Sequence, residues 1–312
     1  MESLYLREFG FGQDPFRIAP DPSFLYLSAS HREALAQLEY GIQARKGFVV
    51  LTGEVGTGKT TLVRTLFEKL EGNTRMSFVY NTIVSPKDLL RYVCEDLGIL
   101  PYEGHYKEMH DYLTSLNRFL LEAYQRGDNV GLVIDEAQNL SAELLESVRL
   151  LSNFEASKDK LLQILLVGQP ELREKLDRPE LRQLKQRIAV RCVIRPLTPE
   201  ETGDYIRFRL RMAGAIDLGL FTDRAVLEIA EYAQGIPRLV NVVCDHCLLI
   251  AYADRKREID TDIVDEAVAS LENGKPLKGR WPRLAREMKA MPLFRWVFGR
   301  LQRPSWERSS SW

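Results

Sequence analysis

The chain has 312 residues, of which 45% are hydrophobic and 28% charged, and its formal net charge at pH 7 is −1. This length suits two domains, and the composition is that of a soluble globular protein with enough apolar residues for a sizeable core. The near-zero net charge gives the chain as a whole no electrostatic preference for nucleic acid or membranes. The sequence contains no run of 18 uncharged apolar residues that would predict a membrane-spanning helix.

The N-terminus and the cysteine content indicate the compartment. The first ten residues, MESLYLREFG, include acidic residues and lack the apolar centre of a secretory signal. Four cysteines are too few for a disulfide framework in a chain of this size. We therefore expect a reduced, cytoplasmic protein.

Between residues 28 and 194, segments typical of helices alternate with short apolar runs. The first such segment, residues 28–47, repeats apolar residues on one helical face. The apolar runs predict strands buried on both faces, as in a parallel sheet, and they are Phe48–Thr52, Met76–Asn81, Val130–Asp135, Leu161–Gly168 and Val190–Ile194. Amphipathic helices are predicted between them, including one that begins after Ser85 and one after Ser141. The alternation predicts an α/β fold with a five-stranded parallel sheet.

After Pro196 the pattern changes to helices alone. Four helical segments are predicted, at Pro199–Met212, Thr222–Tyr232, Pro237–Ala253 and Thr261–Leu271. The last forty residues are basic and aromatic. We therefore expect an α/β core at residues 1–195, a small all-helical domain at 196–272 and a basic aromatic tail at 273–312. The tail is interpreted either as a solvated arm or as a contact to an anionic membrane surface or nucleic acid.

A glycine-rich loop follows the first predicted strand and precedes a helix. Its residues fit the phosphate-binding pattern G-x-x-x-x-G-K-[ST] and are Gly53, Glu54, Val55, Gly56, Thr57, Gly58, Lys59, Thr60 and Thr61. The glycines let backbone N–H groups point into one concavity, at the positive end of the next helix. Lys59 supplies charge to the β- and γ-phosphates, and Thr60 offers a hydroxyl to Mg²⁺. The predicted ligands are therefore ATP and Mg²⁺.

Two acidic residues, Asp135 and Glu136, end the third apolar run. The carboxyl ends of parallel strands are where α/β folds place ligands. Asp135 is therefore predicted to hold Mg²⁺ and Glu136 to polarise the attacking water. The spacing from Lys59 also predicts that another strand, Met76–Asn81, is inserted between the two strands that carry these motifs.

Three further polar positions leave alternatives open when they are judged alone. Gln169, at the end of the fourth run, can orient water or simply form the Gly-Gln-Pro turn. Arg187 belongs to a basic cluster that fits either a solvated helix face or an arginine finger offered to a neighbouring subunit. Arg238, beside Pro237, is of a type that usually lies at the surface.

Taken together, these motifs resemble the AAA+ superfamily, and specifically the ATPases of the GspA/ExeA type from bacterial secretion loci. The stretches that carry the resemblance include GFVVLTGEVGTGKTTLVR, LVIDEAQNL, LLSNFE, LLQILLVGQPELREKL, LRQLKQRI and GIPRLVNVVCD, and they cover most of residues 9–272. The resemblance implies an AAA+ core with a helical lid, and a homo-oligomer, as a ring or filament, whose ATP sites lie between subunits.

The resemblance also implies roles for individual residues. Gln169 falls at the sensor-1 position, Arg187 at the arginine finger and Arg238 at sensor 2. Pro15 and Phe16 are implied to approach the adenine, with Pro237 on its other side.

The implied function is ATP hydrolysis that drives or switches a bacterial secretion or envelope assembly through a protein partner. The alternative is a DNA-binding ATPase that resembles the TniB/TnsC regulators of transposition. The sequence departs from the best-known members because it lacks their membrane-spanning and peptidoglycan-binding regions. We therefore expect a protein that is free in the cytoplasm or peripheral to the inner membrane.

Overall fold

The computed structural model describes residues 5–19, 21–70, 72–80, 82, 84–99, 108–156 and 159–273. By its internal contacts the chain divides into two compact units. Of the described residues, the α/β unit comprises those within 18–201 together with 234–239, and the helical unit comprises 5–17, 202–233 and 240–273. Each unit is described by itself.

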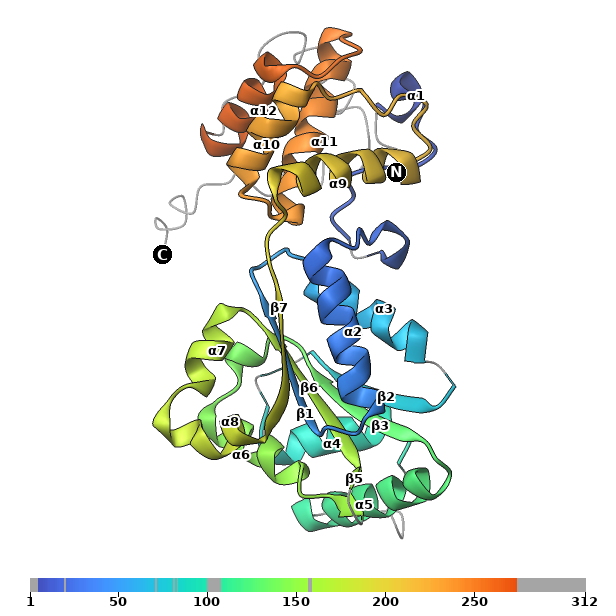
Figure 1. Ribbon diagram of the computed structural model, residues 1–312, viewed down its shortest axis with the longest axis vertical. Helices are drawn as coiled ribbons and strands as arrows, with labels where there is room; N and C mark the ends of the chain where they lie inside the picture. Colours follow the sequence, from blue (N-terminus) through green and yellow to red (C-terminus); the bar gives the residue numbers. More distant parts are fainter. Residues whose placement is uncertain are drawn as a thin grey trace, which may run out of the picture. The chain divides into compact units, whose positions relative to one another are not determined.

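The α/β unit is built on a parallel sheet of five strands, as predicted (Figure 1). In spatial order the strands are β2 (Thr74–Val79), β3 (Asn129–Ile134), β6 (Leu162–Gly168), β1 (Phe48–Gly53) and β7 (Ile188–Ile194). A second, two-stranded sheet pairs β4 (Glu155–Ala156) with β5 (Asp159–Lys160) in antiparallel fashion.

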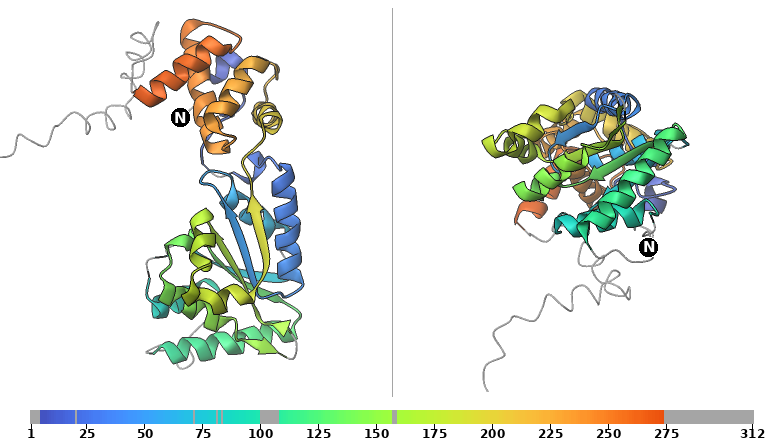
Figure 2. Two further views of the ribbon diagram at one scale, coloured as in Figure 1. Left: turned by 60° about the vertical axis from the view of Figure 1, so that its left-hand side comes forward. Right: turned by 90° about the horizontal axis from the view of Figure 1, so that it is seen from below.

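Helices cover both faces of the five-stranded sheet (Figure 2). Buried side chains of α2 (Ala29–Gln43) and α3 (Lys59–Leu70) pack on one face. The other face carries α4 (Pro86–Asp96), α5 (Met109–Gln125), α6 (Ala142–Leu151) and α7 (Pro170–Leu176). Alternate residues of β1 belong to the two faces, with Val49 in the first apolar cluster and Val50 in the second. This double burial is why the central strands are apolar at consecutive positions.

The strand between β1 and β3 differs from the one that we predicted. β6 lies there, and β2, which contains Met76, lies at the edge of the sheet. All seven residues of β6 are buried, whereas β2 has an exposed Arg75 and several half-buried residues. A strand whose residues are nearly all apolar is favoured between two neighbours and two helical layers, while a partly polar strand tolerates the edge. The prediction of an inserted strand was right, but its identity was wrong.

The helical unit contains α1 (Leu6–Phe9), most of α9 (Pro199–Met212), α10 (Asp223–Ala233), most of α11 (Pro237–Asp254) and α12 (Thr261–Asn273). Its N-terminal segment is held by buried Arg209. The guanidinium donates to the backbone carbonyls of Pro15 and Arg17, at 2.5 Å and 3.0 Å. Residues 5–17 therefore group with the helical unit, whereas we expected them in the core.

The remaining short elements connect these parts, and they are η1 (Pro22–Phe24), η3 (Ala137–Asn139), η4 (Pro179–Leu181) and α8 (Arg182–Arg187). In the described part of the chain, no helix combines the length and apolarity that a bilayer span requires. The predicted basic tail, apart from Asn273, lies outside the described residues.

Candidate functional site

The predicted phosphate-binding loop connects β1 to α3 at the carboxyl edge of the sheet. Gly56 and Gly58 have φ angles of 82° and 92°, in the left-handed region that residues with a side chain rarely adopt. Gly56 is also closely packed, because a Cβ there would lie 2.6 Å from Cβ of Arg238. Thr57 is buried and closes the turn by donating from Oγ1 to the carbonyl of Glu54 at 2.8 Å. The glycines are therefore required by the geometry of the loop.

Lys59, the first residue of α3, is 6% exposed and reaches back over the loop. Its Nζ donates to the carbonyls of Gly53 and Glu54, at 2.8 Å and 2.9 Å. Burial lowers the pKa of the Lys59 ammonium, and the nearby carboxylates, chiefly Glu136 and Asp135, oppose that shift. The Lys59 ammonium is therefore held at the loop, where it can meet the phosphates of a ligand.

The next residue connects the loop to the second motif. Thr60 Oγ1 donates to Asp135 Oδ2 at 2.7 Å, which joins the start of α3 to the end of β3. Asp135 is 7% exposed, and its other oxygen accepts the backbone N–H of Glu136 at 2.8 Å. A hydroxyl beside a carboxylate is a pair of hard oxygen donors of the kind that Mg²⁺ prefers. The residues present therefore fit the predicted metal.

Glu136 adopts a left-handed backbone conformation, with φ of 52°. Two glutamine side chains donate to one oxygen of its carboxylate. Gln138 Nε2 lies 2.5 Å from Oε2, and Gln169 Nε2 lies 3.1 Å from the same atom. The structure thus brings Gln169, at the end of β6, next to Glu136, and its sensor-1 role stays a prediction. Gln138 was not predicted.

A second residue that the sequence did not reveal contacts the loop. His31 of α2 is 2% exposed; its Nε2 lies 2.9 Å from the carbonyl of Thr57, and its Nδ1 lies 2.7 Å from Ser28 Oγ. Burial lowers the pKa of the His31 imidazole. A neutral ring that donates from Nε2 and accepts at Nδ1 satisfies both contacts. His31 therefore stabilises the loop through its hydrogen bond to the Thr57 carbonyl.

The segment from Gln234 to Leu239 belongs to the α/β unit and lies beside the loop. The backbone N–H of Arg238 donates to the carbonyl of Gly56 at 3.3 Å. Arg238, with Pro237 next to it in the chain, is thus brought to the loop. Pro15 and Phe16 belong to the helical unit, where Phe16 packs edge-on against Phe221 with 5.9 Å between ring centroids. Their contact with adenine stays a prediction.

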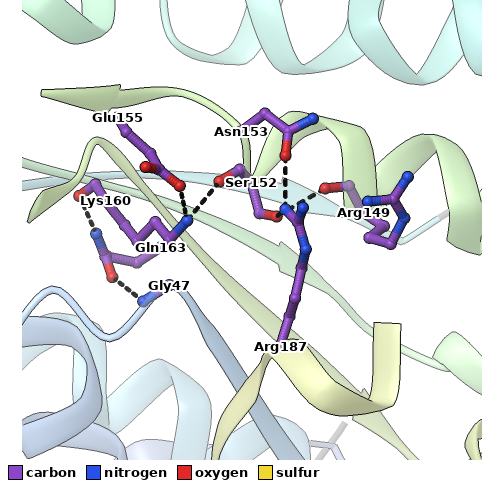
Figure 3. A network of polar contacts seen from close by, with 8 residues as sticks. All are labelled: Gly47, Arg149, Ser152, Asn153, Glu155, Lys160, Gln163 and Arg187. Atoms are coloured by element: carbon purple, nitrogen blue, oxygen red, sulfur yellow. Dashed lines mark hydrogen bonds and ion pairs between the residues drawn. The ribbon is translucent and has the colours of Figure 1, made fainter. Parts of the chain in front are cut away.

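Arg187 lies away from this cluster, at the amino ends of the strands, where Figure 3 shows it beside Ser152 and Asn153. It precedes β7, whose first residue pairs with Phe48 at the start of β1, whereas the loop follows the end of β1. The six residues of β1 separate the amino end of the strand from the loop at its carboxyl end, a distance of about 20 Å. The Arg187 guanidinium instead donates to Ser152 Oγ and Asn153 Oδ1, both at 2.6 Å. Arg187 therefore cannot reach the loop of its own α/β unit.

Comparisons with known proteins agree with this geometry. A family model described as "AAA domain" matches residues 42–176. General secretion pathway protein A of Aeromonas hydrophila is 42% identical over 258 residues, which is 82% of this chain and 46% of that protein. The chain thus spans about half the length of this relative.

Solved structures share the fold at lower identity. The Cdc6p structure from Pyrobaculum aerophilum has a TM-score of 0.62 and 21% identity, covering 89% of this chain and 76% of that one. A Drosophila ORC structure has a TM-score of 0.63 and 18% identity, covering 86% and 66%. The resemblance seen in the sequence is confirmed: the chain is a P-loop protein of the AAA+ fold that is similar over most of its length to General secretion pathway protein A.

Proposed function

We propose that this protein is a Mg²⁺-dependent ATP hydrolase. The observation that carries the proposal is the convergence of four side chains at one edge of the sheet. Lys59 and Thr60 come from the start of α3, and Asp135 and Glu136 come from the end of β3. The Thr60–Asp135 hydrogen bond joins the two groups. A phosphate-binding loop alone would support nucleotide binding, but a carboxylate next to the metal ligands supports hydrolysis.

Each residue has one task in this mechanism. The loop N–H groups and Lys59 bind the phosphates, while Thr60 and Asp135 hold the metal. Bound Mg²⁺ supplies positive charge that offsets the charge developing on the phosphate oxygens. Glu136 orients the water and accepts its proton as the oxygen attacks the γ-phosphorus and ADP leaves. Gln169 fixes the Glu136 carboxylate, and Arg238 contributes charge from beside Gly56.

We propose further that the active form is a homo-oligomer. Arg187 lies at the amino ends of the strands, whereas the loop lies at their carboxyl ends. Its contribution to hydrolysis therefore requires the ATP site of a neighbouring copy. Ser152 and Asn153 hold its guanidinium at this edge. An arginine finger supplied in trans raises turnover by about 10³–10⁵ in GTPases. Isolated subunits are therefore expected to hydrolyse ATP slowly.

The biological role is proposed from similarity alone. The relative is a general secretion pathway protein, and this chain covers 46% of it. We infer that ATP turnover here drives or switches a bacterial secretion or envelope assembly through a protein partner. For ATP binding, we propose that adenine is contacted by Pro15, Phe16 and Pro237. For the biological role, we propose that the tail at 273–312 contacts the partner or a membrane.

The experiment that tests the enzymatic proposal compares the wild-type protein with Glu136→Gln. The variant is expected to bind ATP as tightly as wild type and to lose turnover by about 10²–10⁴-fold. Turnover that survives in the variant would remove Glu136 from its role. The same assay with duplex DNA and with anionic liposomes separates the biological classes. Stimulation by DNA alone would replace the secretion role with the DNA-binding alternative.

A further inference from the structure

Gln138 lies in η3, two residues beyond Glu136, and has a defined position at the carboxyl edge of the sheet. Its backbone carbonyl accepts from Nζ of Lys175 at 2.7 Å, and the same ammonium donates to the carbonyl of Leu140. Lys175 belongs to α7, so these hydrogen bonds connect η3 to the helix that follows β6. The short turn that carries Gln138 is therefore held from outside the motif.

The side-chain amide of Gln138 bridges two strand ends. Its Nε2 donates to Oε2 of Glu136 at 2.5 Å, and its Oε1 accepts the backbone N–H of Gln169 at 3.1 Å. The orientation of the amide is determined by these partners, because a carboxylate only accepts and a backbone N–H only donates. A flipped amide would place donor against donor and acceptor against acceptor. Gln138 thus connects the end of β3 to the end of β6.

The surroundings leave the amide little freedom. A Cβ at Gly168 would lie 2.7 Å from Gln138 Oε1 and 2.9 Å from Cδ2 of Leu172. Glu136, for its part, has a φ of 52°, a conformation that a residue with a side chain keeps only when its surroundings impose it. The hydrogen bond to Gln138 and the backbone turn together set where the Glu136 carboxylate lies.

We propose that Gln138 is a positioning residue for ATP hydrolysis, whose amide holds the Glu136 carboxylate in place and ties it to the backbone of Gln169. The inference rests on the proposed function, in which Glu136 accepts the proton of the attacking water. Gln138 itself touches neither ATP nor water in this scheme and acts through Glu136. Its loss therefore affects the chemical step and leaves nucleotide binding unchanged.

The test uses two replacements of similar length. Gln138→Met removes both hydrogen bonds, and Gln138→Glu keeps an acceptor for the Gln169 N–H but places a carboxylate against Glu136. Both variants are expected to lower kcat at least tenfold, with affinity for ATP and Mg²⁺ within threefold of wild type. If Gln138 served only to hold the Gln169 backbone, Gln138→Glu would keep wild-type kcat, and that result would overturn the proposal.

A matched control exists at the other end of the same sheet (Figure 3). Gln163 of β6 is buried and makes the same pattern of bonds, accepting from the Gly47 N–H and donating to the Lys160 carbonyl, both at 2.8 Å. Gln163→Met is expected to lower the unfolding temperature without a selective loss of kcat. An equal loss of kcat in Gln163→Met and Gln138→Met at matched stability would show a general effect of buried amides and would overturn the proposal.

A double-mutant cycle separates this inference from the proposed function. In the Glu136→Gln background, adding Gln138→Met should leave the residual single-turnover rate unchanged, because the residue through which it acts is already gone. A further tenfold loss there would contradict a positioning role. If Glu136→Gln alone retained full turnover, the proposed function would fail first. If it lost turnover while Gln138→Met did not, only the inference would fail.

Discussion

Thr60 Oγ1 donates a hydrogen bond of 2.7 Å to Asp135 Oδ2, although 75 residues separate the two in the chain. The contact joins the first turn of α3 to the first residue after β3. The protein itself therefore aligns the two oxygen donors that the proposed metal site requires. A ligand pair aligned in this way loses less conformational entropy when the metal binds.

Replacing Asp135 by Asn keeps the shape of the side chain and removes its charge. The affinity for ATP in the presence of Mg²⁺ is expected to fall tenfold or more, as for loss of a charge-assisted contact of about 1.5–3 kcal/mol. Affinity measured in EDTA should not change. Asp128→Asn, in the residue that precedes β3, is the control and should behave as wild type in both titrations. A Mg²⁺-independent loss in Asp135→Asn would contradict the assignment.

Gly56→Ala is expected to damage the phosphate-binding loop through a close contact as well as through backbone strain. Gly127 has nearly the same φ, 83° against 82°, but its Cβ would meet nothing within 4 Å. Gly127→Ala should therefore cost about 1–2 kcal/mol of unfolding free energy from the left-handed conformation alone. Gly56→Ala should cost more in urea denaturation, and it alone should weaken ATP binding. Equal effects of the two changes would argue against the packing of Gly56 on Arg238.

His31 predicts a pH dependence of stability. Burial lowers the pKa of the His31 imidazole in the folded protein, so the unfolded chain binds the proton more readily. The stability contributed by neutral His31 is complete above about pH 6.5 and is lost as the pH falls below that value, by up to about 1.4 kcal/mol per pH unit. His31→Gln, which keeps a donor for the Thr57 carbonyl, should show a flatter profile between pH 6.5 and 5 in urea titrations.

The control for this experiment is His110→Gln, at an exposed position on α5. Its pH profile should run parallel to that of wild type. If wild type and His31→Gln have the same slope, protonation of His31 does not limit stability.

Arg187 predicts complementation between two inactive proteins. Arg187→Ala should bind ATP normally and hydrolyse it slowly, while Lys59→Ala should not bind it. A mixture of the two contains sites with an intact loop from one subunit and an intact arginine from the other, so turnover should rise above the sum of the separate rates. Arg187→Lys, which keeps the charge but lacks the planar, five-donor guanidinium, should restore little activity. A strictly additive mixture would show that Arg187 does not act between subunits.

The fold and the motif residues could be predicted because their signals are local. The largely apolar run of β6 and the glycines before Lys59 carry their structural meaning in the sequence itself. The position of β2 could not be read in this way, because strand order depends on which strands tolerate an edge. Arg75 within β2 was the available clue, since a central strand would have buried it.

Gln138 and His31 were missed for a different reason. Each acts through hydrogen bonds to residues distant in the chain, Gln169 and Thr57, and no spacing rule relates the partners. A glutamine two residues after Glu136 in a 3₁₀ turn was a weak signal for the first. Nothing in the sequence distinguished His31 from other histidines in a helix.

The most direct test of the account is an equilibrium titration of the purified protein with ATP in the presence of Mg²⁺, compared with Lys59→Ala. Wild type is expected to bind one ATP per chain, and the variant to lose most of that affinity. Circular dichroism should show that the variant keeps its fold. If the wild-type protein failed to bind, or if Lys59→Ala bound ATP as tightly, the loop between β1 and α3 would not be a nucleotide site.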